Sequence, residues 1–191
     1  RRVLDATALI ADLNPGVADS SPAELTEFQD TLVFSASGQD ADGEDVGREL
    51  FGLDSSGRIS LLADIRAGQA GSNPGGFTLY DGSLIFAADG DAGRELYRLD
   101  TDGAVTRVAD ICHGPHGSNP GGFTVFDGKL IFAADGPHGR ELFQLNSNGE
   151  VRQLKDIFHG HGSSNPSEFT EYNGKLFFAA AGSKGRELFA L

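Results

Sequence analysis

Four copies of one short motif divide this chain into equal parts. Gly-Arg-Glu-Leu recurs every 46 residues, at Gly47–Leu50, Gly93–Leu96, Gly139–Leu142 and Gly185–Leu188. A second marker, an Asp followed ten residues later by a Pro, also occurs four times, at Asp12/Pro22, Asp64/Pro74, Asp110/Pro120 and Asp156/Pro166, and its last three occurrences are 46 residues apart. A fixed period of this length indicates a repeat architecture, in which each unit packs on its neighbours.

Each copy predicts four short strands and no helix. In the second copy we expect strands over Phe77–Tyr80, Ser83–Ala88, Arg94–Leu99 and Val105–Ala109. Turn residues such as Asp81-Gly82 separate them. The second strand is apolar on both faces and is expected to be buried, whereas the fourth alternates with polar residues and is expected nearer to solvent. Four antiparallel strands of this kind are typical of a β-propeller blade.

The ends of the chain predict how such a propeller closes. Val3–Ala11 aligns with fourth strands such as Val105–Ala109, and the chain ends at Leu191 just after a third strand. We therefore expect the N-terminal strand to complete the last blade, which would remove an exposed sheet edge. The predicted fold is an all-β, four-bladed β-propeller of four-stranded antiparallel blades in a single domain, 1–191. The blades would span about 22–63, 74–109, 120–155, and 166–191 plus 3–12. An elongated β-solenoid is the alternative.

The repeat resembles a known family. Gly-Arg-Glu-Leu followed by an aromatic residue, the Asp-Ile or Asp-Leu ending, and the Ser/Asn-Pro before a Phe-Thr strand are similar to the ELWxxDGT (hyalin-like) repeat of secreted and surface-attached bacterial proteins. The Trp of that motif is replaced here, by Phe51, Tyr97, Phe143 and Phe189. The resemblance implies an extracellular, periplasmic or cell-surface location, with a signal peptide already removed, and it brings no established catalytic residues.

Charge and composition narrow the expected partners. The net charge of −13 disfavours nucleic acid and anionic membrane surfaces, because both would repel the chain. No apolar run is long enough to insert into a membrane. Phosphate-binding and dinucleotide-binding motifs are absent, so we expect no organic cofactor. A protein, a glycan or the subunits of a larger assembly are the expected partners.

Six residues form a candidate metal site, and they are Cys112, His113, His116, His138, His159 and His161. In a propeller, the loops that carry them would all lie on one face, in two adjacent blades. Thiolate and imidazole groups suit Zn²⁺, Cu²⁺ or Ni²⁺. The alternative is that they are polar loop residues on the surface.

Further candidates lie in the first copy and on the innermost strands. The loop between the second and third strands of copy one carries carboxylates at Asp40, Asp42, Glu44 and Asp45. It resembles part of a Ca²⁺ loop, with a solvated acidic loop as the alternative. Four Thr residues on the innermost strands are expected to line a central channel, at Thr26, Thr78, Thr124 and Thr170.

The repeated charged residues are expected to be structural. Each Arg of Gly-Arg-Glu-Leu should meet an acidic group on an adjacent blade. Each repeated Asp should cap the loop that follows it by accepting backbone N–H bonds. For function, we expect a secreted or surface-exposed binding or scaffold propeller with no catalysis of its own. The alternative is a metal-binding protein or metalloenzyme that uses the Cys and His residues.

Overall fold

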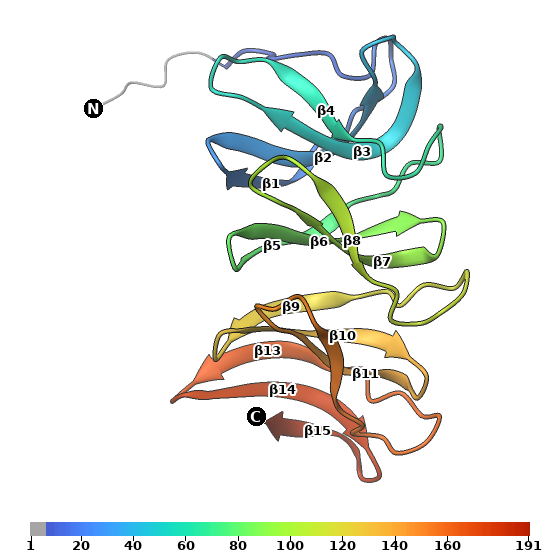
Figure 1. The fold of residues 1–191 in the computed structure, drawn as a ribbon, viewed down its shortest axis with the longest axis vertical. Coiled ribbons are helices and arrows are strands. Elements are labelled where there is room, and N and C mark those ends of the chain that lie inside the picture. Colours follow the sequence, from blue (N-terminus) through green and yellow to red (C-terminus); the bar gives the residue numbers. More distant parts are fainter. Residues whose placement is uncertain (1–6) are drawn as a thin grey trace. The chain divides into compact units, whose positions relative to one another are not determined.

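The computed structural model describes residues 7–191, and the chain forms two compact units, 1–73 and 74–191, which we treat one at a time. Across the described residues every regular element is a β-strand (Figure 1). The same residues include no helix with the length and apolar character needed to cross a membrane. The all-β class is therefore confirmed.

The first unit contains one antiparallel sheet in the order β1-β2-β3-β4. Its strands are β1 (Ala23–Phe28), β2 (Thr31–Gln39), β3 (Asp45–Leu53) and β4 (Ile59–Ala63). One buried cluster of this sheet includes Phe34, Val46 and Phe51. Leu13, from the segment that precedes β1, packs against this core.

The second unit contains three antiparallel sheets, two of four strands and one of three. Sheet two consists of β5 (Gly75–Tyr80), β6 (Ser83–Gly90), β7 (Gly93–Leu99) and β8 (Val105–Ala109). Sheet three consists of β9 (Gly121–Phe126), β10 (Lys129–Gly136), β11 (Gly139–Leu145) and β12 (Val151–Lys155). Sheet four consists of β13 (Ser167–Tyr172), β14 (Lys175–Gly182) and β15 (Gly185–Ala190). Strand β9 contacts both β5 and β13, so the three sheets meet at their first strands.

Apolar side chains fill the spaces between neighbouring sheets of this unit. Ile85 and Leu96 of sheet two share a core cluster with Phe132 of sheet three. Ile131 and Leu142, on the other side of sheet three, pack in the same way against sheet four. Within each of these sheets three aromatic rings are in contact. In sheet two, Phe86 is tilted against Phe77 and stacked on Tyr97, with centroids 5.6 and 6.0 Å apart.

The strands expected from the second copy are confirmed within two residues at each end. The strand expected to be buried on both faces, β6, has five consecutive buried residues, and the outer strand β8 has none. The unit of four consecutive antiparallel strands is therefore present in sheets one, two and three, as the turn residues predicted.

The expected N-terminal strand is not formed in the described residues. Of the span Val3–Ala11, positions 3–6 lie outside the description, and Thr7–Ala11 form no strand and are exposed. Sheet four accordingly has three strands rather than four. Sheet one already has four strands, and the segment before β1 is not one of them.

Candidate functional site

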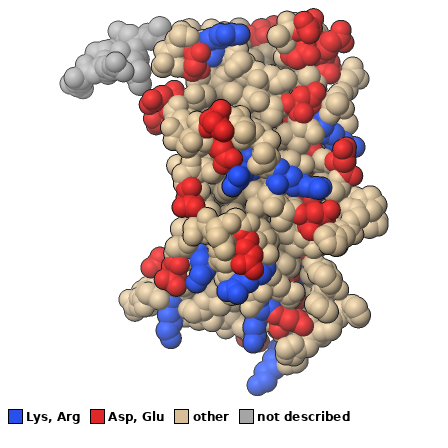
Figure 2. Space-filling model, viewed as in Figure 1, with Lys and Arg blue, Asp and Glu red and all other residues tan. Residues whose placement is uncertain are grey.

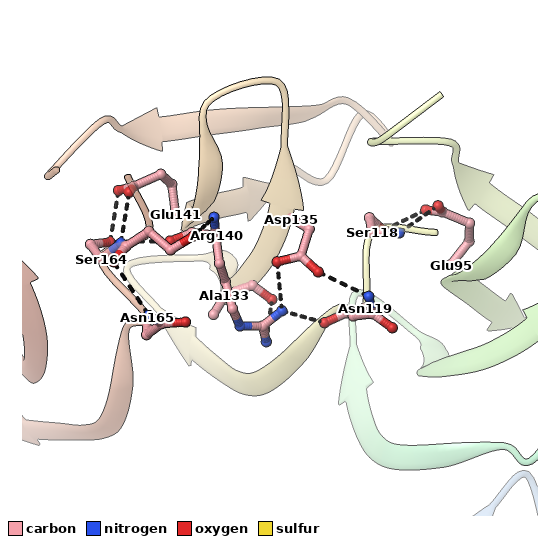
Figure 3. Close-up of polar contacts among 10 residues, drawn as sticks. Glu95, Ser118, Asn119, Ala133, Asp135, Arg140, Glu141, Ser164 and Asn165 are labelled. Atoms are coloured by element: carbon pink, nitrogen blue, oxygen red, sulfur yellow. Dashed lines mark hydrogen bonds and ion pairs between the residues drawn. The ribbon is translucent and has the colours of Figure 1, made fainter. Parts of the chain in front are cut away.

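In the first three Gly-Arg-Glu-Leu motifs the Glu is a buried carboxylate that holds the loop following its own sheet. Glu141 is fully buried and accepts hydrogen bonds from Ile157 N at 2.8 Å, Ser164 N at 2.9 Å and Ser164 Oγ at 2.7 Å (Figure 3). Glu95 binds Ile111 and Ser118 in the same way. We call this arrangement the Glu–loop contact, and in the first unit Glu49 makes it with Ile65, Arg66 and Ser72.

Burial changes the acidity of two of these carboxyl groups. Desolvation raises the pKa of Glu95 and of Glu49 above the ordinary value of 4.5. Hydrogen bonds from Ser118 and Ser72 act in the opposite direction on the pKa values, because they favour the charged form. The nearby Asp110 carboxylate adds to the rise in the Glu95 pKa. Each buried Glu therefore carries a desolvation cost that its loop donors offset in part.

The loop lies so close to the strand that only glycine fits at one point. Gly117 has a φ of +67°, and a Cβ there would collide with the backbone nitrogen of Arg94. Ser118, the next residue, donates both its N–H and its hydroxyl to Glu95. The close approach and the carboxylate together fix the loop against sheet two.

In three copies the Arg of the motif ties its own sheet to the loop that enters it, at Arg48, Arg140 and Arg186. Arg140 Nη1 donates to Asn119 O at 2.7 Å and lies 3.5 Å from Asp135 Oδ1 (Figure 3). Arg140 Nη2 donates to Ala133 O at 3.4 Å. The expectation that these Arg residues meet acids on adjacent blades is therefore wrong. In the β10–β11 register Arg140 is directly opposite Asp135, so its partners lie on its own sheet.

Two of these arginines line an open hollow of about 360 Å³ in the second unit. Arg140 and Arg186 contribute its two charged side chains. The remaining wall comes from the starts of β9 and β13 and the residues just before β13, at Gly121, Gly122, Asn165, Pro166 and Ser167. No carboxylate lines the hollow, which makes it the candidate binding site of this unit.

The six candidate metal ligands are not brought together. The rings of His138 and His161 lie 6.4 Å apart between centroids, which is the one ring contact among them in the described residues. His113 and His159 each lie beside the repeated Asp three residues earlier, at 3.5 and 3.6 Å, with side chains 90% and 87% exposed. Cys112 is a half-buried free thiol, and His116 is exposed. Within residues 7–191 no three His, Cys, Asp or Glu side chains are grouped as a metal ion requires.

The acidic loop of the first unit mainly caps its own turn. Asp40 Oδ1 accepts the N–H groups of Asp42 and Glu44, each at 2.9 Å, and Asp45 Oδ1 accepts Gly47 N at 2.9 Å. Asp42 and Glu44 are exposed. These bonds fit the solvated acidic loop, and the Ca²⁺ site stays a prediction.

At Asp110 and Asp156 the Oδ1 atom does not cap the following loop as expected. Asp110 Oδ1 and Asp156 Oδ1 are buried and have no hydrogen-bond partner in the described residues. The loop N–H groups bind Glu95 and Glu141 instead. The role of Glu in holding the loop was not predicted from the sequence. The recurrence of Glu in every copy, like that of Asp, could have indicated it. Two of the Thr hydroxyls donate within their own strands, Thr26 to Glu24 O and Thr78 to Gly76 O, and the channel lining stays a prediction.

Comparisons with known proteins give distant likenesses. No family model matches the chain, and no curated protein matches it, so the ELWxxDGT resemblance stays a prediction. One similar solved structure is a gluconolactonase from Xanthomonas campestris, with 15% identity, a TM-score of 0.46, and coverage of 95% of this chain and 70% of that one. Another is a luciferin-regenerating enzyme, with 11% identity, a TM-score of 0.46, and coverage of 90% of this chain and 57% of that one.

One expectation is corrected by these two neighbours. Both are enzymes, which contradicts the prediction that this chain is not an enzyme. At these identities and TM-scores the likeness assigns no activity or substrate to the chain.

The raised pKa values give a pH dependence with a definite sign. Because folded Glu95 holds its proton more tightly than the unfolded chain does, the free energy of unfolding should fall as the pH rises above 4.5. A Glu95→Gln variant has no ionisable group at this position, so its free energy of unfolding should fall less as the pH rises. Urea denaturation from mildly acidic to neutral pH checks it, with the exposed Glu171→Gln as the control. Parallel pH profiles for Glu95→Gln and the wild type would contradict the assignment.

Proposed function

We propose that the chain is a closed four-bladed β-propeller that serves as a rigid binding scaffold. The observation that carries the proposal is that two residues of sheet four are exposed although their counterparts in the other sheets are buried. Leu188 is 73% exposed, whereas its counterparts in the other copies are fully buried, at Leu50, Leu96 and Leu142. Glu187 is also exposed, although the equivalent Glu is fully buried in each of the other three copies. Sheet four lacks the fourth strand and the following loop that would cover these two residues.

The segment before β1 corresponds in its sequence positions to the fourth strand and the following loop that sheet four lacks. Thr7–Ala11 precede Asp12 directly, as β4, β8 and β12 precede their own repeated Asp. Leu13 packs on sheet one as Ile111 and Ile157 pack on sheets three and four. Ser20 stands two residues before Pro22, which is the position of the Ser residues that bind Glu95 and Glu141.

These correspondences support a specific closed arrangement. Thr7–Ala11 would extend sheet four along β15, with Leu9 opposite Phe189, as Leu61 is opposite Phe51 in sheet one. Leu13 N and Ser20 would then supply Glu187 with the donors that Ile157 and Ser164 supply to Glu141. Closure would bury the exposed Leu9, Ile10 and Leu188, and it would remove a free sheet edge.

A closed ring of this kind suits binding because its loops are fixed. The Glu–loop contacts hold the connections between sheets, so little conformational entropy is lost when a partner binds. A protein, a glycan or a larger assembly is the proposed partner, and a location outside the cytoplasm is part of the proposal. The resemblance to the ELWxxDGT repeat supports that location. A propeller does not by itself determine the ligand, so binding has to be measured directly.

Closure predicts a large effect at an exposed residue. Glu187→Ala should lower the free energy of unfolding about as much as Glu141→Ala, by roughly 3 kcal/mol, because each leaves loop donors unpaired. The exposed Glu171→Ala should change it by less than about 0.5 kcal/mol. Denaturant titration of the three variants checks this. A Glu187→Ala variant that behaves like Glu171→Ala would contradict closure.

The binding function predicts a partner that depends on the closed fold. The wild-type chain should bind saturably to members of a glycan array or to a purified cell-surface protein. A Leu188→Asp variant should lose most of this binding, because the charge would prevent the N-terminal segment from covering β15. Leu25→Asp, which places the same charge at an exposed position of β1, is the control. Absence of saturable binding by the wild type on both kinds of surface would overturn the scaffold function.

A further inference from the structure

We propose that the hollow between sheets three and four binds an oxyanion, which is a carboxylate, sulfate or phosphate group, through Arg186 and Arg140. This inference rests on the proposed binding function, because it names the ligand chemistry of that function. It does not require ring closure, since every residue of the hollow belongs to the second unit. Guanidinium groups bind such oxyanions with two parallel hydrogen bonds, which gives both affinity and orientation.

The repeat itself shows that Arg186 lacks a counter-ion. In copies two and three an Asp stands directly opposite the Arg, as Asp89 opposite Arg94 and Asp135 opposite Arg140. These pairs are 3.4 and 3.5 Å apart. In copy four Ala181 occupies the Asp position opposite Arg186. No ion pair of Arg186 occurs within residues 7–191, so its charge has no internal compensation there.

The Arg186 guanidinium is already held in place for a ligand. Nη1 donates to Asn165 O at 3.0 Å, and Nη2 donates to Ser167 Oγ at 2.8 Å and to Ala179 O at 3.4 Å. A guanidinium has five N–H donors, so these three bonds leave Nε–H and one Nη1–H to donate singly to a ligand. Because the side chain is fixed beforehand, binding costs little side-chain entropy.

The rest of the hollow also favours an anion. Gly121 and Gly122 contribute no side chains to its wall, which leaves the two guanidinium groups accessible. Asn165 and Ser167 add polar groups that suit hydroxyl or oxyanion oxygens. Arg140 is only partly compensated, because Asp135 also accepts a hydrogen bond from Asn119 Nδ2 at 2.9 Å. Two cations therefore line the hollow, and the carboxylate that Arg140 shares with Asn119 lies outside the lining.

Local charge decides binding here, despite the net charge of −13. On the face seen in Figure 2, basic and acidic side chains are interspersed, and the acidic excess does not form one continuous patch. Exposed charges farther away than about 10 Å are largely screened at 0.1 M salt. An oxyanion in the hollow is therefore affected mainly by the charges nearest to it, which are Arg140, Arg186, Asp135 and Glu168, the residue after Ser167.

The test is a titration with sodium sulfate, sodium phosphate and sodium acetate at constant ionic strength, read by nuclear magnetic resonance of the Arg Nε–H and backbone amide signals. We expect at least one of these anions to saturate the signals of Arg186 and Ser167 with one-to-one stoichiometry. The anion that saturates them identifies the preferred oxyanion. No saturable shift at these residues with any of the three, up to tens of millimolar, would overturn the proposal.

Two variants separate the site from general charge effects. Arg186→Gln removes the cation, and Ala181→Asp supplies the internal counter-ion that copies two and three already have. Each should weaken anion binding about tenfold or more. Lys184→Gln, which removes the same charge from the neighbouring hairpin, should change it less than about twofold. Ala181→Asp does not remove the Arg186 hydrogen bonds to the loop, so it remains informative if Arg186→Gln fails to fold. Equal affinity in all variants would contradict the inference.

The outcomes also distinguish this site from the proposed function. Anion binding that survives in Leu188→Asp, together with lost partner binding, would leave the site standing and place the macromolecular contact elsewhere. Partner binding by the wild type without any anion binding would overturn the site and leave the scaffold function intact.

Discussion

The structure depends on a buried Glu in three of the four repeats and on the loop that each one holds. Glu49, Glu95 and Glu141 are fully buried and accept donors from the residues that lead into the next copy. A buried carboxylate without partners would cost several kcal/mol, so the loop has to be in place for the sheet to be stable. The same contact fixes where each following copy begins. This is consistent with the recurrence of both the Gly-Arg-Glu-Leu motif and the Asp-to-Pro spacing in every copy.

In the last copy the Glu–loop contact is incomplete. Glu187 stands at the motif position of the three buried Glu residues but is itself exposed. Ser20 stands at the position of the Ser residues that donate to those carboxylates. The same copy has Ala181 where two others have an Asp, and Arg186 keeps its bonds to the entering loop without a counter-ion. The two departures lead to different proposals. The exposed Glu187 and Leu188 support closure by the N-terminal segment, and the uncompensated Arg186 supports an oxyanion site.

Much of the fold followed from the sequence because turn residues and alternation act locally. The bounds of β5 to β8 were predictable from Asp-Gly turns and apolar runs. Side-chain partners were less predictable, because each copy has both a repeated Asp and a repeated Glu, such as Asp110 and Glu95. The depth of each carboxylate in the sheet decides which of the two accepts the hydrogen bonds of the loop, and the sequence does not show that depth. The contacts of Arg140 with its own sheet were not predicted, for the same reason. The Cys and His residues lie in loops, where periodicity says nothing about the direction of a side chain.

The central claim is that the N-terminal segment completes sheet four within one chain. In a Cys112→Ser background, Ala8→Cys and Ala190→Cys would stand opposite each other, as Ser60 and Gly52 do in sheet one. Mass spectrometry and non-reducing electrophoresis after mild oxidation measure the cross-link, with Val17→Cys replacing Ala8→Cys as the control. The account predicts a rapid disulfide within the monomer for the Ala8 pair only. A cross-link no faster than the Val17 control, or one that forms only between two chains, would contradict it.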